Sequence, residues 1–298
     1  MPELPDVMAY IHALEQRVIG RKLQKLQIVS PFVLRTYETP VSDTKGKTVE
    51  ELQRIGKRIV FKLNTNLFMA VHLMIAGRFR WVDQSDAKPP GKIGLASFHF
   101  DHGTLHLVES SKKKRASIHI MRGSVALDAF DRGGIDVLTC SPEQFREQLQ
   151  RENHTLKRAL TDPRLFDGIG NAYSDEILHA AGLSPLKWTT RLTDEEITRL
   201  HDACRRVLQH WIDALRKKFD IKFPGPRDIT AFRPEFAAHG KFGEPCPTCG
   251  AAIQRIVYSE NEVNYCPRCQ TDGKILADRS LSRLLHNDWP RTIEELED

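Results

Sequence analysis

The alternation of hydrophobic and polar positions divides the chain into a helical start, a long stretch of short strands and a second half that is again helical. Hydrophobic residues recur at helical spacing near the start and Gly20 follows them, which predicts a helix over residues 6–19. From about residue 21 to 127 the pattern changes to β-branched and aromatic runs separated by turn residues, such as "RIVFKL", "LFMAVHLMIAGRFRWV", "IGLASFHF" and "TLHLVE". Many short strands of this kind predict a sandwich or a barrel.

The second half contains one strong helix pattern. "SPEQFREQLQ" opens a first helix, and "TDEEITRLHDACRRVLQHWIDAL" is the strong one, because Thr193 and Glu196 form a capping box at its start. Apolar residues line one face of this helix: Ile197, Leu200, Cys204, Val207, Leu208, Trp211 and Leu215. "KFPGPRDITAF" follows and is predicted to be a loop, because proline and glycine interrupt it.

Composition narrows the class of protein. The chain has 298 residues, 40% of them hydrophobic, which suggests about two domains with sizeable cores. No apolar run approaches the ~18 residues that span a bilayer, and the start lacks the pattern of a secretory signal, so we expect a soluble intracellular protein. The net charge of +5 permits nucleic-acid binding but is weak evidence for it.

Four of the six cysteines form two C-x-x-C pairs, "CPTC" (Cys246, Cys249) and "CPRC" (Cys266, Cys269), with 16 residues between them. This spacing predicts a closed tetrahedral site for one structural Zn²⁺. Disulfides are the alternative, but an intracellular chain disfavours them. Cys140 lies near a linker, and the sequence offers it no evident partner.

The stretch "DGIGNAYSDEIL" places two glycines around Ile169 and then Asn171, directly before a helix. Backbone N–H groups and the Asn171 amide at such a helix start could bind a phosphate. A plain turn between two helices is the alternative, and this stretch alone favours it.

The opening stretch "MPELPDV" crowds prolines and carboxylates ahead of the first helix. If Met1 is removed, Pro2 becomes the terminus, and its secondary amine is a nucleophile that can attack a carbon and pass to an iminium. An α-amino group titrates near ~8, so part of it is unprotonated at neutral pH, and Glu3 beside it can supply or accept protons. A helix start is the alternative, because proline and acidic residues are favoured there.

Taken together and in this order, "PELPDV", "GKR" at Lys57, "GIGNAYSDEIL" and the two C-x-x-C pairs resemble the formamidopyrimidine-DNA glycosylase/endonuclease VIII (Fpg/Nei) family. The resemblance runs from Pro2 to about Gln270. It implies a multidomain α+β fold: a catalytic β-sandwich with flanking helices over residues 1–132, a helix–two-turn–helix domain over 133–238, and a zinc finger over 239–275. Residues 276–298 form a tail of unknown role that extends past the usual end of the family.

The resemblance also implies a function. Members excise oxidised bases from double-stranded DNA and cleave the strand at the abasic site, with no metal or nucleotide cofactor in the chemistry. Pro2 would attack C1′ of the damaged nucleotide, Glu3 would transfer protons, Lys57 would contact the backbone near the lesion and Asn171 would bind phosphate. Oxidised purines such as 8-oxoguanine or formamidopyrimidines are the expected substrates of a monomeric, cytoplasmic, bacterial-type enzyme that associates with the nucleoid through DNA.

Two positions and one loop that bear on DNA binding depart from the family pattern. Asn261 stands where the family has an arginine that clamps the phosphates flanking the lesion, and Ile75 stands where the family has a void-filling methionine. The family's Arg- and Phe-bearing loop corresponds here to "ESSKKKRAS", which contains no aromatic residue. Its basic residues suit phosphate contacts or form a solvated hairpin tip, and they are Lys112, Lys113, Lys114 and Arg115.

These departures leave more than one interpretation open. The chain is either a bifunctional glycosylase and abasic-site lyase or a family member that binds lesions or abasic sites with weak or altered chemistry. A zinc-ribbon regulator unrelated to repair would explain only the last quarter of the sequence. We also expect poor discrimination of the base opposite the lesion, because the rebuilt loop lacks the residues that read it.

Overall fold

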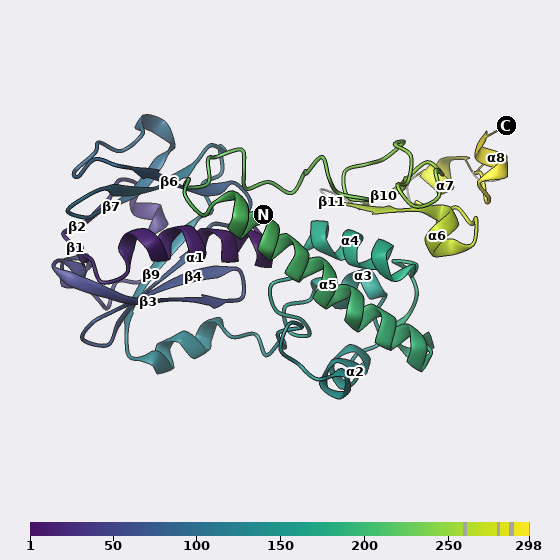
Figure 1. The fold of residues 1–298 in the computed structure, drawn as a ribbon, viewed down its shortest axis with the longest axis horizontal. Helices are drawn as coiled ribbons and strands as arrows, with labels where there is room; N and C mark the ends of the chain where they lie inside the picture. Colours follow the sequence, from purple (N-terminus) through teal and green to yellow (C-terminus); the bar gives the residue numbers. More distant parts are fainter. Residues whose placement is uncertain (259–260, 279–280, 286–288, 298) are drawn as a thin grey trace. The chain divides into compact units, whose positions relative to one another are not determined.

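The computed structural model describes residues 1–258, 261–278, 281–285 and 289–297. Its elements are shown in Figure 1. The chain forms two compact units. The first comprises Met1–Arg132 and Trp211–Thr230, and the second comprises Gly133–His210 and Ala231–Asp298.

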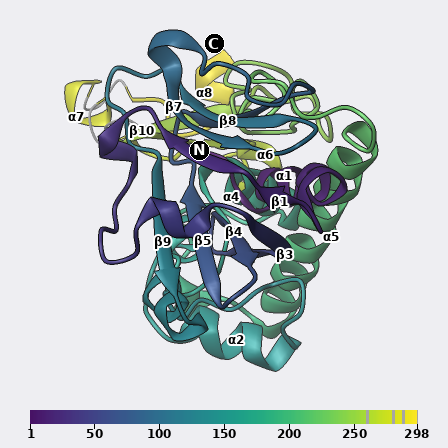
Figure 2. The same cartoon turned by 90° about the vertical axis from the view of Figure 1, so that its left-hand side faces the viewer.

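The first unit contains two antiparallel sheets and the N-terminal helix α1 (Leu4–Val18). One sheet has the order β1-β3-β4-β5-β9, with bounds Lys22–Leu23, Lys47–Ile55, Arg58–Leu63, Leu67–His72 and Ser117–Arg122. The other has the order β2-β7-β8-β6, with bounds Lys25–Ile28, Gly94–His99, Thr104–Glu109 and Gly77–Val82. Figure 2 shows β3, β4 and β5 side by side in the first of these sheets.

The two sheets pack face to face around an aromatic core. The Phe61 ring of β4 stacks on the Phe98 ring of β7 with 5.7 Å between the ring centroids, and Phe79 of β6 meets Phe98 edge to face. The opposite face of β4 and β5 is covered by the 3₁₀ helix η4 (Ser124–Phe130), with Val60 and Phe68 buried beneath it. Because both faces are covered, these strands are almost continuously apolar. The predicted sandwich is confirmed.

Helix α1 begins two residues earlier than the hydrophobic pattern predicted. The Glu3 N–H donates to the Asp6 carboxylate at 2.9 Å, so this side chain caps the free start of the helix. Gly20 follows the helix with a φ of 73°, a left-handed conformation that glycine adopts without strain. The short 3₁₀ turns of this unit are η1 (Pro31–Val33), η2 (Val41–Thr44) and η3 (Gly91–Ile93).

The second unit is helical at its start, with α2 (Pro142–Gln150), α3 (Leu156–Thr161), α4 (Asn171–Ala181), η5 (Thr189–Arg191) and most of α5 (Asp194–Lys218). The predicted capping box of α5 is confirmed, because the Glu196 N–H donates to Thr193 Oγ1 and the Thr193 N–H to Glu196 Oε2. On its apolar face Val207 and Trp211 are only half-buried, and Ile212, which the pattern missed, is buried. No helix in the described part of the chain is long and apolar enough to cross a bilayer.

The finger at the end of this unit is a β-hairpin followed by short helices: β10 (Gln254–Tyr258), β11 (Asn261–Tyr265), α6 (Pro267–Thr271), α7 (Leu281–Leu285) and α8 (Glu294–Glu297). The tail folds back onto it, because the Ile293 N–H donates to the Gly273 carbonyl at 2.9 Å and the Ile275 N–H to the Arg291 carbonyl at 2.8 Å. The Ile293 side chain is buried in one cluster with Ala251, Ile253 and two of the cysteines. Ile293 of the tail is therefore part of the finger's core.

Candidate active site and DNA-binding surfaces

The start of the chain is buried in the first unit. Pro2 is buried, Glu3 is only 3% exposed, and Met1 is 38% exposed. Burial is the main reason why the pKa of the Met1 amine is lowered from its ordinary value; the Glu3 charge opposes this shift, and Arg78 and then Lys57 reinforce it. The terminal amine therefore interacts with two predicted site residues and with Arg78, which sequence reasoning did not single out.

Lys57 lies at the tip of the hairpin between β3 and β4. Ile55 pairs with Arg58, so Gly56 and Lys57 form a two-residue loop. Gly56 has a φ of 61° at the first central position, where such hairpins favour glycine. This turn presents Lys57 at the end of two well-paired strands.

Ile75 lies on the tight turn between β5 and β6 and is 53% exposed. Met74 in this turn has a φ of 54°, and the Gly77 N–H closes the turn on the Leu73 carbonyl at 2.9 Å. A Cβ on Gly77 would lie 2.2 Å from the Leu73 oxygen, so only glycine fits there. The turn therefore projects Ile75 outward on a rigid support.

Arg78 follows this turn on β6 and connects two parts of the first unit. Its Nε donates to the Ile229 carbonyl at 2.9 Å, and its Nη1 donates to the carbonyls of Ile75 and Gly77 at 3.1 and 2.7 Å. The only signal in the sequence was a basic residue directly after "HLMIAG", which is too common a feature to predict this role.

The basic loop between β8 and β9 is organised by Glu109, which is 1% exposed. Its carboxylate accepts the backbone N–H groups of Arg115 and Ala116 at 2.8 and 2.9 Å and the Ser111 hydroxyl at 2.6 Å. The Lys114 ammonium donates to the Glu109 carbonyl. Three of the four predicted basic residues, Lys112, Lys113 and Arg115, are exposed, whereas Lys114 is half-buried.

Asn171 is the first residue of α4, as predicted, but its side chain has a partner within the second unit. Its Nδ2 donates to the Glu262 carbonyl on β11 at 2.9 Å. Its own carbonyl accepts Lys157 Nζ at 2.6 Å, and that ammonium also pairs with buried Asp175 at 2.6 Å. The helix start is thus joined to the finger hairpin one residue from Asn261, whose side chain lies outside the described part of the chain.

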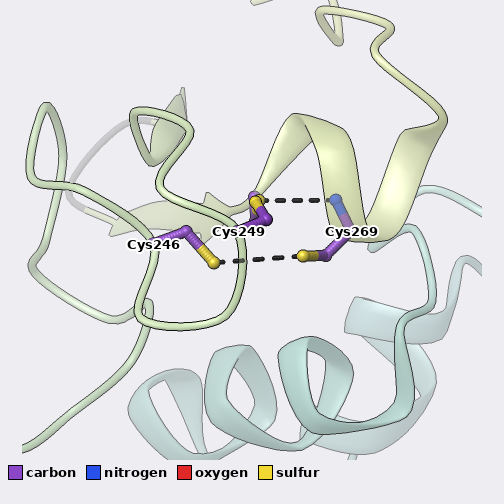
Figure 3. Close-up of side chains that lie close together, drawn as sticks. Cys246, Cys249 and Cys269 are labelled. Carbon is purple, nitrogen blue, oxygen red and sulfur yellow. Dashed lines mark hydrogen bonds between the residues drawn. The ribbon is translucent and has the colours of Figure 1, made fainter.

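The four predicted cysteines converge in the finger, with all four sulfurs within 4.8 Å of one another. Figure 3 shows the sulfurs of Cys246 and Cys269 facing each other, 3.9 Å apart, and Cys249 and Cys266 are separated by 3.4 Å. A Zn–S bond of about 2.3 Å places tetrahedral sulfurs about 3.8 Å apart, so the group fits one Zn²⁺. His179 Nε2 of α4 lies 3.2 Å from the Cys246 sulfur. The four ligands complete the tetrahedron, and the zinc is structural.

Three protein-family models match consecutive parts of the chain. Residues 1–116 match the formamidopyrimidine-DNA glycosylase N-terminal domain, residues 137–221 match the formamidopyrimidine-DNA glycosylase H2TH domain, and residues 243–271 match the zinc finger found in FPG and IleRS. Together they cover well over half of the sequence.

Similar proteins span almost the same length. The formamidopyrimidine-DNA glycosylase of Symbiobacterium thermophilum is 29% identical over 276 residues, covering 91% of this chain and 89% of the relative. A Lactococcus lactis FPG mutant in complex with Fapy-dG-containing DNA superposes with a TM-score of 0.80 at 27% identity, over 91% of this chain and 100% of that one. The Lactococcus lactis Fpg with abasic-site DNA gives a TM-score of 0.77 at 26% identity, over 90% and 99%. The chain therefore belongs to the formamidopyrimidine-DNA glycosylase family of bifunctional DNA glycosylases and abasic-site lyases.

Proposed function

We propose that this protein removes oxidised bases from double-stranded DNA through a Schiff base on Pro2 and then cleaves the abasic strand. One observation carries the proposal: Pro2 and Glu3 are both buried at the start of α1, and Arg78 and Lys57 act on the amine of Met1, the residue directly before Pro2. When Met1 is removed, the Pro2 nitrogen becomes the terminal amine, and burial favours its unprotonated, nucleophilic form.

The first step joins the Pro2 nitrogen to C1′ of the damaged nucleotide. The bond from C1′ to the base breaks, and the base leaves with the bonding electrons and a proton. Opening of the sugar between C1′ and its ring oxygen gives an iminium, and the Glu3 carboxyl donates a proton to that oxygen. Lys57, at a rigid hairpin tip, supplies a positive charge for the phosphate backbone near the lesion.

Binding to DNA is assigned to residues of both units, each on its own surface. In the first unit the exposed members of Lys112–Arg115 contact phosphates, and Ile75 enters the space left by the extruded base. In the second unit the start of α4 at Asn171 and the neighbouring strand at Asn261 form one phosphate-binding edge, supported by the hydrogen bond from Asn171 to Glu262.

Oxidised purines are the proposed substrates. Structures of Lactococcus lactis FPG contain Fapy-dG-containing DNA in one case and DNA with an oxidised pyrimidine in another, so the family fold accommodates both. The opening stretch "PELPDV" is nearer the purine-excising branch of the family, which decides the preference proposed here.

Borohydride trapping tests the proposal. Full-length protein is incubated with duplexes carrying an oxidised purine, an oxidised pyrimidine or an abasic site, and the reduced adduct is located by mass spectrometry. An adduct on the Pro2 nitrogen is expected, and a variant with an uncleaved residue ahead of Pro2 should form none.

An adduct on Lys57 would reassign the nucleophile. Specific binding of abasic DNA without any adduct would favour the other interpretation, a family member that binds lesions and has lost the chemistry.

A further inference from the structure

The segment from Ile221 to Thr230 returns from the long helix α5 to the first unit and is anchored there at its beginning. The Arg17 Nη2 of α1 donates to the Ile221 carbonyl at 2.9 Å, and the same guanidinium lies over the Phe223 ring, 5.4 Å from its centroid. Phe223 in turn packs against Tyr10 with 5.9 Å between centroids. The entry into the segment is therefore fixed to α1.

The far end of the segment is anchored in the sandwich. Ile229 is 1% exposed and belongs to the main apolar cluster of the first unit. Between the anchors the chain makes a tight turn, in which the Gly225 N–H donates to the Asp228 carboxylate at 2.8 Å and the Asp228 N–H to the Gly225 carbonyl at 3.1 Å. Two prolines, Pro224 and Pro226, restrict this turn further.

Arg78 is the polar link between the end of this turn and the β5–β6 turn, and the Lys218 ammonium of α5 also pairs with Asp228 at 3.2 Å. A single guanidinium reaches the Ile229 carbonyl at the end of the turn and the Ile75 and Gly77 carbonyls on the β5–β6 turn. The planar fork of arginine can hold several acceptors in fixed directions, whereas the lysine ammonium is a single point of charge on a flexible stem. Arg78 thus sets the spacing between two surface turns that are far apart in the sequence.

A cavity of about 180 Å³ lies where these parts meet. Its walls come from the β5–β6 turn, from β6, from the end of β8 with the start of the basic loop, and from the proline turn. The residues that line the cavity include Ile75, Arg78, Arg80, Val108, Ser110 and Pro226. Pro226 and Ile75 both line the cavity and lie on the two turns that Arg78 joins, so a change at Arg78 alters the spacing between these two parts of the lining.

We infer that Arg78 is a positioning residue that holds the Pro224–Asp228 turn against the Ile75 turn and thereby sets which damaged bases the enzyme accepts. The inference rests on the proposed function, because it assumes that the cavity receives part of the lesion. That Arg78 holds the two turns together, called the clamp below, follows from the hydrogen bonds alone. The charge of Arg78 also acts on the amine of Met1, the residue directly before Pro2.

Hydrogen exchange of the free full-length protein tests the clamp. Arg78→Met should speed exchange of the Gly225 and Asp228 amides by roughly tenfold or more, because the end of the turn loses its hydrogen bond to the β5–β6 turn and keeps only the burial of Ile229. Arg78→Lys should fall between this variant and the wild type. Arg80→Met is the matched control, since Arg80 lies on the same strand and lines the same cavity, and within the described residues no hydrogen bond joins it to the turn. Unchanged exchange in a folded Arg78→Met protein would overturn the clamp.

Kinetics test the specificity. The ratio of kcat/KM between duplexes with an oxidised purine and an oxidised pyrimidine should change by roughly tenfold in Arg78→Met. Trapping on a duplex that already has an abasic site should change less, because no base needs to fit. An unchanged ratio in a folded variant would overturn the specificity role. If the wild type forms no adduct with any duplex, the proposed function fails, and the exchange experiment still decides whether the clamp exists.

Discussion

The two compact units are held together in different ways. The first is built on one large apolar cluster between two sheets, which includes stacked phenylalanines and the buried face of α1. The finger in the second unit has a small cluster in which Cys246 and Cys266 pack with Ala251, Ile253 and Ile293, so its order depends on the metal. The proposed chemistry belongs to the unit that needs no metal, whereas one of the proposed phosphate-binding edges, at Asn171 and Asn261, belongs to the unit that does. Chemistry and binding should therefore be separable by mutation.

The largest expected effect is on chemistry alone. Glu3→Gln should lower base excision by roughly a hundredfold or more, because a general acid loses its proton, while affinity for abasic DNA stays within about threefold. Single-turnover excision and equilibrium binding on the same duplex measure the two quantities. Glu15→Gln, an exposed position on the same helix, is the control. Equal losses of excision and affinity would contradict the separation.

Removal of zinc should have the opposite pattern. Cys249→Ser or a chelator should weaken DNA binding by roughly tenfold or more, since binding of the metal and folding of the finger are coupled. Hydrogen exchange should speed up in β10 and β11 and stay slow in β7 and β8. The comparison between the units would be wrong if the sandwich strands lost protection together with the finger.

The basic loop should contribute a smaller, salt-dependent part of binding. Each lost phosphate contact reduces the slope of log K against log salt by about 0.9. Replacement of Lys112, Lys113 or Arg115 by alanine should reduce this slope by about 0.9 wherever the lost side chain contacts a phosphate. Lys114→Ala should act mainly on loop order, because its ammonium is held by the Glu109 carbonyl. If Lys114→Ala alone reduced the slope of log K against log salt by about 0.9, the hydrogen bond between the Lys114 ammonium and the Glu109 carbonyl must break when DNA binds.

Acid should destabilise the first unit before the second. Burial, reinforced by Arg58, Lys57 and His119, lowers the pKa of His72 to about 4 from its ordinary 6.5. A histidine that titrates lower in the folded state takes up protons preferentially when unfolded. Its stabilising effect is complete above pH 6.5 and is lost as the pH falls from there towards about 4.

Burial also lowers the pKa of His99, His106 and His119 in the same unit, and of His201 in the second. Thermal unfolding and hydrogen exchange across this pH range should show the sandwich losing stability first. His72→Gln should reduce the pH dependence without lowering stability near neutral pH by much. A finger that opened in acid while its zinc remained bound and the sandwich stayed closed would contradict this order.

Local patterns predicted the elements well and the links between them poorly. "RIVFKL" and "TLHLVE" coincide with β4 and β8, and the Thr193–Glu196 capping box was found, because each depends on neighbours in sequence. The convergence of four cysteines followed from spacing alone. The return of residues 211–230 to the first unit had no local signal, because distant tertiary contacts cause it.

The same reason explains the missed site residues. Arg78 matters through Ile229, 151 positions away, and one charged residue in a strand gives no hint of that partner. The partners of Glu109 are near in sequence, but its role depends on how the loop folds around its carboxylate. Asn171 was found from its position at a helix start, but its hydrogen bond to Glu262, 91 positions away, was not. The opening stretch itself pointed to Pro2 and Glu3, and the family resemblance strengthened that interpretation and added Lys57. Their roles remain predictions that the experiments above test.

The folded tail has a consequence for the lifetime of the bound metal. Ile293 packs against the cysteine cluster, and the backbone beside it is hydrogen-bonded to Gly273 and Ile275. A chelator that must reach the sulfurs from this side can act only after the tail has detached. The rate of zinc release should then level off as chelator concentration rises, at a limit equal to the opening rate of the tail. Ile293→Ala should raise that limit, so the segment around Arg291 and Ile293 would slow the release of the metal.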